Sequence, residues 1–254
     1  MHVPRLRTKI VFLTPSLQGG GAERVFLTLL RHLDRKEFEP HLVVLRAEGE
    51  FTCQLPHDVV LHTLGGGRYG LVFQVFLSSC SLVWLLRKIH PRAVLSNGRL
   101  SLLLALARPM LPRDTKVLAR EPSLLSVRID SDTWHPRLWR WLYQSLYRWV
   151  DRVVCHTDTM VMDMTEQFKV PKQRSIRIYN PIDVELVRGM GMSGASPYGG
   201  PGPNLVAAGR LSKEKGFDLL LAAMPKSISL MVSSSVTITF SGFKSRCATP
   251  RSCV

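Results

Sequence analysis

The sequence predicts an α/β protein built on a doubly wound parallel sheet, and two features of its first part predict it. Short apolar runs bounded by turn residues alternate with longer segments that carry an apolar residue every three or four positions. Such runs are typical of buried parallel strands, and such segments of helices packed on a sheet. A glycine loop at residues 19–21 directly follows the first run. Because ligands of a doubly wound sheet bind beyond the carboxyl ends of its strands, the loop is expected on the ligand side.

The expected elements follow one another in alternation. The first strand covers residues 9–14, and the glycine loop leads from it into a helix with apolar residues from Ala22 to Leu33 on one face. Further strands are expected at residues 41–46, 59–64, 93–96, 115–119 and 152–155, and helices at residues 71–89 and 100–107. Strands that alternate with helices over this many units predict βαβ connections in one parallel sheet.

Composition divides the chain into four parts. Residues 1–183 form the expected first domain. Six glycines and three prolines between residues 189 and 203 predict a linker over residues 184–203. Residues 204–225 are interpreted as the strand, loop and helix that start a second Rossmann-like domain. Residues 226–254 contain no Asp or Glu and are expected to be an irregular tail. Since a complete domain of this kind needs roughly a hundred residues or more, we expect the second domain to be incomplete.

The net charge of +15 and the pI of about 10.2 favour anionic partners. The 34 basic residues are scattered and form no block of the kind found in nucleic-acid-binding segments, so phosphorylated ligands and a membrane surface are favoured over DNA or RNA. The five cysteines include no C-x-x-C pair, and no metal site is expected. The continuous apolar run before Thr14 and Pro15 has only four residues (Ile10 to Leu13), too few for the core of a signal peptide, and a cytoplasmic location is expected.

Two segments raise the question of a membrane. Residues 69–86 carry no charged side chain, but polar residues recur there at helical spacing, which favours a core helix over a helix at a membrane surface or a full span. Residues 134–149 hold four of the five tryptophans together with three arginines. That combination suits a membrane interface, and a packed helix with extended arginines explains it as well. The core face of this second helix is expected to consist of Leu138, Leu142, Leu146 and Val150.

Two motifs are candidates for binding a phosphorylated ligand. Glycines between a strand and a helix let backbone N–H groups approach an anion at the positive end of the helix dipole. A tight turn without a ligand explains the glycines equally well. Arg210 and Lys215 flank a second loop between a strand and a helix, where two cations suit a diphosphate and stabilise its charge as it leaves. A solvated charged loop is the ordinary explanation of such a string.

Three stretches together resemble the family-four, or group 1, glycosyltransferases. They are Gly-Gly-Gly-Ala-Glu-Arg at residues 19–24, Tyr-Asn-Pro-Ile-Asp at 179–183 and Ala-Gly-Arg-Leu-Ser-Lys-Glu-Lys-Gly-Phe-Asp at 208–218. The Arg-Trp-Val-Asp-Arg-Val-Val-Cys-His-Thr stretch at 148–157 is similar to the family's step from helix to strand. The order and spacing of these stretches also agree with the family, and the resemblance covers residue 9 to about residue 225.

The resemblance implies a GT-B enzyme, a retaining hexosyltransferase that transfers a sugar from a nucleotide-sugar to a glycan or lipid-linked acceptor. It implies an acceptor-side first domain, a donor-binding second domain, and no metal or other cofactor. Gly20 and Gly21 would approach the donor phosphates, and Arg210 and Lys215 would hold the diphosphate.

By their place after a strand, Arg120 and Glu121 are acceptor-side candidates, with a surface ion pair as the alternative. Location at a membrane surface would bring a lipid-linked acceptor within reach. No catalytic residue is assigned.

One departure from the family bears on activity. The family's later pair of glutamates, eight positions apart, has no counterpart, because no Glu occurs after Glu214. We therefore expect a truncated second domain, and the alternative to an active transferase is a catalytically inactive form that only binds acceptor or a partner. An unrelated Rossmann-type binding protein with a fortuitous Arg-Lys loop is the third reading.

Overall fold

The computed structural model describes residues 7–18, 20–65, 71–192 and 216–223. The chain divides into two units, Met1–Val187 and Arg188–Val254, and in the second unit the structure describes the end of helix α7 (Val184–Met192) and helix α8 (Phe217–Ala223). Arg210, Lys215, Gly19, the rest of the expected linker and the expected tail lie outside the described residues. The expected boundary at residue 183 stays a prediction.

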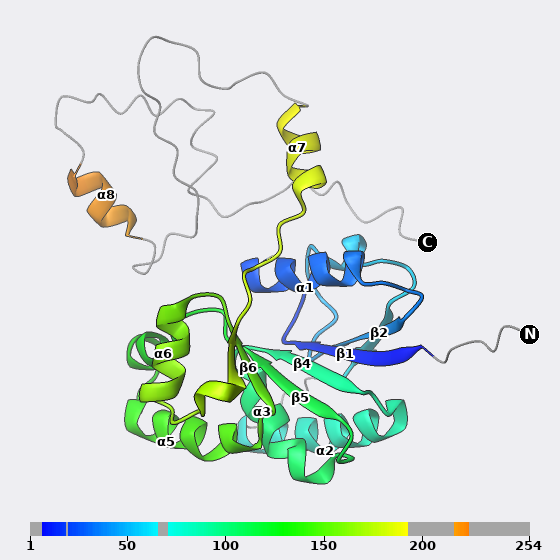
Figure 1. Ribbon diagram of the computed structural model, residues 1–254, viewed down its shortest axis with the longest axis horizontal. Helices are drawn as coiled ribbons and strands as arrows, with labels where there is room; N and C mark the ends of the chain where they lie inside the picture. Colours follow the sequence, from blue (N-terminus) through cyan, green and yellow to red (C-terminus); the bar gives the residue numbers. More distant parts are fainter. Residues whose placement is uncertain (1–6, 19, 66–70, 193–215, 224–254) are drawn as a thin grey trace, which may run out of the picture. The chain divides into compact units, whose positions relative to one another are not determined.

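The first unit contains a seven-stranded sheet in which every neighbouring pair of strands is parallel (Figure 1). The strand order is β3-β2-β1-β4-β5-β6-β7, which confirms the doubly wound sheet that the sequence predicts. The strands are β1 (Thr8–Thr14), β2 (Phe38–Val44), β3 (Val60–Thr63), β4 (Ala93–Asn97), β5 (Lys116–Arg120), β6 (Arg152–Cys155) and β7 (Ser175–Arg177).

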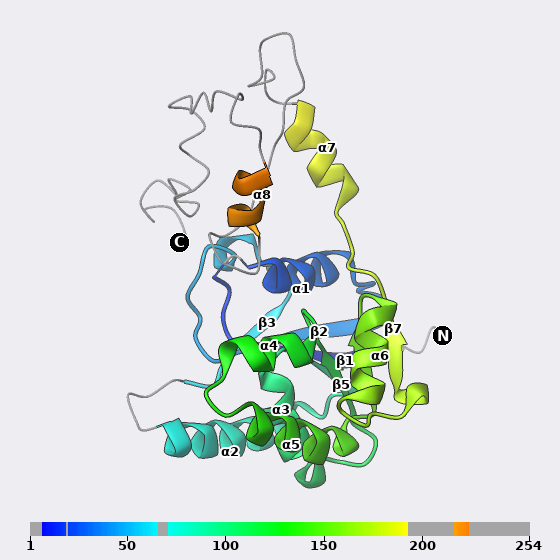
Figure 2. The same ribbon diagram turned by 90° about the vertical axis from the view of Figure 1, so that its left-hand side faces the viewer.

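The side chains of the central strands point alternately to the two faces of the sheet, and they build one hydrophobic layer on each face. In β1, Val11 and Leu13 join one buried cluster, while Phe12 between them joins the other, because successive side chains of a strand point to opposite faces. Helix α1 (Gly21–His32) packs on the Phe12 side through Phe26 and its neighbours. Helices α2 (Leu71–Ile89), α3 (Leu100–Ala107), α4 (Leu125–Asp132), α5 (Pro136–Leu146) and α6 (Asp158–Glu166) contribute to the layer on the other face (Figure 2).

The observed elements differ from the expected ones first in β2. Strand β2 begins at Phe38 rather than at residue 41, and it includes Pro40. Pro40 pairs with Ile10 of β1, while the pairing with β3 begins only at His41, so the missing N–H of the proline lies where the strand has a neighbour on one side only.

Helices α4 and α6 and the three-residue strand β7 are additions to the elements that the sequence predicts. Residues 184–192, expected as linker, form α7, and the Asp183 carboxylate caps it by accepting the backbone N–H of Leu186 at 3.0 Å.

The buried face of α5 corrects another expectation. Leu138, expected in the core, is 52% exposed, whereas Tyr143 and Tyr147 are fully buried. The tyrosines can be buried because their hydroxyl groups have hydrogen-bond partners inside the protein. The part of α2 whose side chains are described is a core helix, with Leu82 and Leu86 in the main cluster. In the described part of the chain, no helix is long and apolar enough to cross a membrane.

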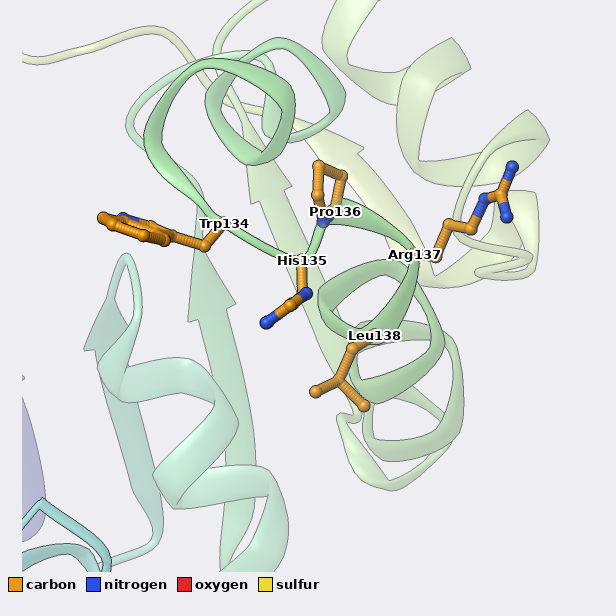
Figure 3. Close-up of a pocket in the computed structure, with 5 residues that line it drawn as sticks. All are labelled: Trp134, His135, Pro136, Arg137 and Leu138. Carbon is orange, nitrogen blue, oxygen red and sulfur yellow. The ribbon is translucent and has the colours of Figure 1, made fainter.

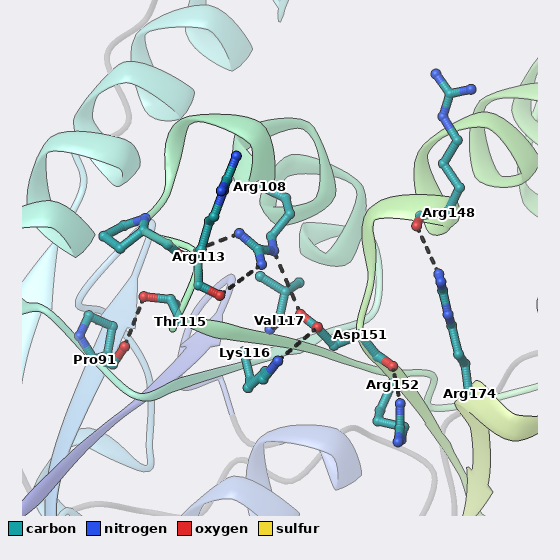
Figure 4. Close-up of polar contacts among 11 residues, drawn as sticks. Pro91, Arg108, Arg113, Thr115, Lys116, Val117, Arg148, Asp151, Arg152 and Arg174 are labelled. Carbon is teal, nitrogen blue, oxygen red and sulfur yellow. Dashed lines mark hydrogen bonds and ion pairs between the residues drawn. The ribbon is translucent and has the colours of Figure 1, made fainter.

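Asp151 ties β5 and β6 together at the amino ends of these strands (Figure 4). Its carboxylate accepts the backbone N–H of Val117 at 2.9 Å and lies 3.6 Å from the nitrogen atoms of both Arg108 and Lys116. Thr115 donates its hydroxyl to the carbonyl of Pro91 at 3.0 Å, which links the segments that lead into β4 and β5. These contacts at the amino edge are structural, and the opposite edge carries the candidate site.

Candidate functional site

The strand order reverses between β1 and β4, and this is where ligands of doubly wound sheets bind. β1, β2 and β3 extend to one side of this point, and β4 to β7 extend to the other. The loop before α1 leaves the carboxyl end of β1, and the Asn97-Gly98 turn leaves the carboxyl end of β4. Gly98 has φ of +60°, a conformation that favours glycine and lets the chain turn at once into α3.

Arg120, the last residue of β5, connects three segments at this edge. Its Nη1 donates to Oδ1 of Asn97 at 3.0 Å, and its Nη2 donates to Oδ1 of Asn180 at 2.7 Å. The side chain is buried, and burial lowers the pKa of Arg120, while the carboxylates of Glu121 and Glu23 act to raise it. The guanidinium group stays charged, because an arginine pKa lies far above neutral pH. The result is a fixed cation at the switch point of the sheet.

Glu121 lies on the opposite side of the backbone from Arg120 and is completely buried. It forms an ion pair with Arg128 of α4, whose Nη2 lies 2.8 Å from Oε2, and it accepts a hydrogen bond from the hydroxyl group of Tyr147. Burial raises the pKa of the Glu121 carboxyl, although Arg128 and Tyr147 act against this. A surface ion pair between Arg120 and Glu121, the alternative considered above, is wrong, because both side chains are buried and Glu121 pairs with Arg128.

Arg128 belongs to the same buried cluster. Burial is the largest effect and acts to lower its pKa, but the Glu121 carboxylate together with Tyr143 and Tyr147 raises the pKa of Arg128 overall. The same Nη2 also donates to the hydroxyl oxygen of Tyr143 at 3.2 Å. We call Glu121, Arg128, Tyr143 and Tyr147 the Glu121 cluster. It joins β5 to α4 and α5 and fixes the chain directly after Arg120.

Gly20 and Gly21 lie where the sequence predicts, at the start of α1 beyond the carboxyl end of β1. A Cβ atom at Gly21 would meet nothing within 4 Å, so a ligand can approach the backbone there. A Cβ atom at Gly20 would meet only the carboxylate of Glu23, in the first turn of α1. The same carboxylate acts on the pKa of Arg120, which places the beginning of α1 and Arg120 at one edge.

His156 follows β6 at the same edge, and its Nδ1 is buried without a hydrogen-bond partner in the protein. Burial lowers the pKa of this histidine, the carbonyl of Pro122 raises it, and the charge of Arg120 lowers it further. The imidazole is therefore held neutral near Arg120 at physiological pH, and, with its N–H directed to the Pro122 carbonyl, its Nδ1 atom can accept a hydrogen bond.

The sequence interpretation identified part of this site. It singled out Gly20, Gly21, Arg120 and Glu121, and the structure brings all four to the carboxyl edge. It missed the partners of Arg120 and Glu121, although the Asn-Gly and Asn-Pro dipeptides that follow strands were a usable signal for two of them. The missed residues are Asn97, Arg128, His156 and Asn180. Among the described residues, no group of three His, Cys, Asp or Glu side chains could hold a metal ion.

A hollow of about 630 Å³ lies at the start of α5 and is lined by residues 134–138 (Figure 3). A second hollow, of about 380 Å³, lies at the amino edge of the sheet, where Arg7, Lys9 and Arg92 contribute to its wall. The lining of neither hollow includes Arg120.

Comparison with known proteins gives a family and a fold. The model of glycosyltransferase family 4 matches residues 19–186. HepE from Anabaena, solved in complex with UDP-glucose, aligns with a TM-score of 0.61 and 16% identity over 87% of this chain and 58% of its own. Sucrose-phosphate synthase from Thermosynechococcus elongatus aligns with a TM-score of 0.59 and 14% identity over 86% of this chain and 59% of its own.

The apo form of the lipopolysaccharide outer core galactosyltransferase WaaB gives a TM-score of 0.53 and 13% identity over 69% of this chain and 46% of its own. At these identities, the likeness shows the fold. The chain spans about half the length of these solved structures. A search of curated proteins found no match.

Proposed function

The chain belongs to glycosyltransferase family 4, and we propose that it transfers a sugar from a nucleotide-sugar to a glycan or lipid-linked acceptor. Its seven-stranded parallel sheet with helices on both faces has the GT-B type of fold. In this proposal, the sheet domain is the acceptor side, and the transfer retains the anomeric configuration of the sugar. The titles of two structures of HepE name UDP with glucose and UDP-glucose as its ligands, which supports a nucleotide-sugar as the donor.

The observation that carries the proposal is the position of Arg120. A buried arginine costs free energy unless its donors are satisfied, and this one is held by two asparagine side chains at the switch point of the sheet. These two hydrogen-bond partners come from segments far apart in the sequence, the end of β4 and the segment after β7. We propose that this fixed cation, with the free Nδ1 of His156 beside it, binds polar groups of the acceptor.

Glu121 has a different role in this account. Its carboxylate is buried and already engaged by Arg128 and Tyr147, so it positions the segment after β5 instead of touching an acceptor. Arg120 is the acceptor-side contact, and Glu121 is a positioning residue.

The donor diphosphate is assigned to the glycine loop and to the second domain. The first N–H groups of a helix have no partner within the helix, and the backbone at Gly21 is open to a ligand. Arg210 and Lys215 would grip the diphosphate and stabilise its charge as it leaves, which makes a metal ion unnecessary. The Glu23 carboxylate over Gly20 is the group that a phosphate would have to displace.

Turnover tests the proposal directly. The full chain is incubated with a panel of nucleotide-sugars, with and without glycan and lipid-linked acceptors, and released nucleoside diphosphate is measured. We expect acceptor-dependent release of nucleoside diphosphate with at least one donor, and a product that has the donor's anomeric configuration by NMR. The Arg210→Ala variant should bind the diphosphate at least about tenfold more weakly. Arg46→Ala, an exposed arginine after β2, is the matched control.

A catalytically inactive form that only binds acceptor or a partner is the second candidate. It predicts acceptor binding that depends on Arg120, without release of nucleoside diphosphate from any donor.

A further inference from the structure

Helix α5 exposes a stripe of large apolar side chains. Leu138 and Trp141 are three residues apart on the helix and share one face, and Trp134, which precedes the helix, lines the same hollow as Leu138. Trp134, Leu138 and Trp141 are 96%, 52% and 60% exposed, respectively. Figure 3 shows Trp134 extending away from the start of the helix, with Leu138 one turn further on. We call these three residues the α5 stripe.

The opposite face of α5 fixes the orientation of the stripe. Tyr143 and Tyr147 on that face are fully buried and bonded into the Glu121 cluster. Turning the stripe inward would break the contacts of Arg128 and Glu121 with these hydroxyl groups. Burial of the stripe therefore needs an external surface.

The helices around the stripe carry an excess of positive charge, and the exposed Asp130 and Asp132 of α4 are carboxylates near its start. The sequence contains no Asp or Glu from residue 59 to residue 113 or from residue 133 to residue 150, so α2, α3 and α5 carry no carboxylate. Arg137 lies next to the stripe, and Arg140 is bonded to Asp130 of the neighbouring α4. The cationic side chains that these helices and their ends contribute are Arg87, Lys88, Arg99, Arg108, Arg137, Arg140 and Arg148.

Two further exposed tryptophans belong to the same helical layer. Trp84 of α2 is 63% exposed, with the Lys88 ammonium group 5.3 Å from the centre of its ring. Trp149, directly after α5, is exposed and has the Arg148 guanidinium group 5.3 Å from its ring centre. Helices α2 and α5 both pack against α3 on this side of the sheet (Figure 2). The layer thus presents aromatic rings paired with cations.

We propose that the α5 stripe docks this protein on the surface of an anionic phospholipid bilayer. Tryptophan rings partition to the level of the headgroups, and a helix with an apolar face flanked by arginines lies in that plane. Arg137 and Arg148 would contact headgroup phosphates, whose negative charge complements the cations of α2, α3 and α5. The exposed aliphatic Leu138 between the two tryptophans favours lipid over nucleic acid, because an aliphatic side chain offers no stacking surface to a base.

The stripe is connected to the candidate site. The Arg99 guanidinium group, directly after the β4 turn, lies 5.7 Å from the ring centre of Trp139 on α5. The start of α5 therefore lies near the edge that carries Arg120. The inference rests on the proposed function in one respect: a bilayer on this face would deliver a lipid-linked acceptor to that edge.

Co-sedimentation of the full chain with vesicles tests the inference without any sugar donor. Vesicles of phosphatidylcholine alone are compared with vesicles of phosphatidylcholine and phosphatidylglycerol, and tryptophan fluorescence is recorded in parallel. We expect binding to the anionic vesicles, a blue shift of the emission, and weakening of binding by salt. The double variant Trp134→Ser/Trp141→Ser and the variant Arg137→Glu should each reduce vesicle binding about tenfold or more.

The controls are Arg46→Glu and Val60→Ser, an exposed arginine and an exposed apolar residue outside the helical layer, and both should bind as the wild type does. Unchanged circular dichroism and unfolding curves establish that the stripe variants fold. Wild-type failure to bind anionic vesicles overturns the inference. The inference is also overturned if the stripe variants only convert a dimer into monomers, or if an oligonucleotide binds the protein and displaces the vesicles. Donor turnover with a soluble acceptor, measured separately, distinguishes failure of the docking surface from failure of the proposed function.

Discussion

The Nη2 atom of Arg120 donates a 2.7 Å hydrogen bond to Oδ1 of Asn180, although 60 residues separate the two along the chain. Arg120 ends β5, and Asn180 lies in the segment that leaves β7 and leads to α7. The hydrogen bond holds the segment that follows β7, the last strand, next to the end of β5 near the middle of the sheet. It therefore couples the path of the chain out of the sheet domain to the cation at the candidate site.

Replacement of Arg120 by Met should cost stability and acceptor binding together. Asn97 is buried and would lose its donor, so we expect a loss of about 1–3 kcal/mol in the free energy of unfolding, measured with urea. Asn180 is exposed, and Asn180→Ala should cost less than about 1 kcal/mol while still weakening acceptor binding. An equal loss of unfolding free energy in Arg120→Met and Asn180→Ala would contradict this difference between the two variants.

Arg128→Met leaves the buried Glu121 carboxyl without its cation. We expect a cost of about 3–5 kcal/mol in the free energy of unfolding at neutral pH, since an unpaired buried charge is strongly unfavourable. Burial already raises the pKa of Glu121, and loss of Arg128 raises it further. A raised carboxyl pKa favours the folded state below the ordinary pKa and is unfavourable above it, so the cost should shrink as the pH falls toward 4.

Arg137→Met, an exposed substitution on α5, is the control and should change stability by less than about 0.5 kcal/mol at each pH. A cost for Arg128→Met that stays constant with pH would contradict a charged Glu121 in the variant.

Cys155 should resist alkylation in the folded protein. Burial raises the pKa of its thiol to about 12, with Glu121 and Asp163 adding to the effect, so the reactive thiolate is scarce at neutral pH. Cys53 and Cys80 are exposed. Iodoacetamide followed by peptide mass mapping should modify these two in the native protein and Cys155 only after unfolding in urea. Native modification of Cys155 at the rate of Cys80 would contradict the buried position.

His41 and His62 should make the protein less stable in mild acid. The two rings are stacked, with Nδ1 of His41 3.1 Å from Nε2 of His62, and burial lowers the pKa of both. A lowered histidine pKa contributes stability above the ordinary value of about 6.5, and this is lost as the pH falls through the folded-state pKa. His41→Gln should flatten the decline of unfolding free energy below pH 6.5, whereas His57→Gln, at an exposed position, should leave it unchanged.

Much of the sheet could be predicted from local pattern. The segments that became β1, β4, β5 and β6 are short apolar runs between turn residues, and a strand buried on both faces has this signature. Helix α4 was missed because only Leu125 and Ile129 of its residues are buried, which leaves little periodicity to detect. The three residues of β7 are too few for a pattern.

The sequence predicted where the candidate site lies, but it did not predict which residues contact one another there. The position of Arg120 and Glu121 after a strand placed them at the carboxyl edge, as the structure has them. Their burial depends on Arg128 and Tyr147, which reach the site through helices packed in three dimensions. The expected core face of α5 was wrong at Leu138, which is exposed, whereas Val150 is buried and Leu146 packs against the core. Tyr143 and Tyr147 were not expected there, because buried tyrosines with satisfied hydroxyl groups follow no simple hydrophobicity scale. The roles of Arg210 and Lys215 stay predictions.

The most direct test of the central claim is hydrogen–deuterium exchange of the full chain with and without a nucleotide-sugar and an acceptor glycan. The account predicts slower exchange in residues 20–24, 97–101, 120–124 and 178–183, which lie at the carboxyl edge of the sheet. It predicts no change in residues 7–9, 90–92 and 113–116, which lie at the amino edge. Protection at the carboxyl edge that is lost in Arg120→Met would support the site. Protection confined to the amino edge, or absent with every donor and acceptor, would contradict it.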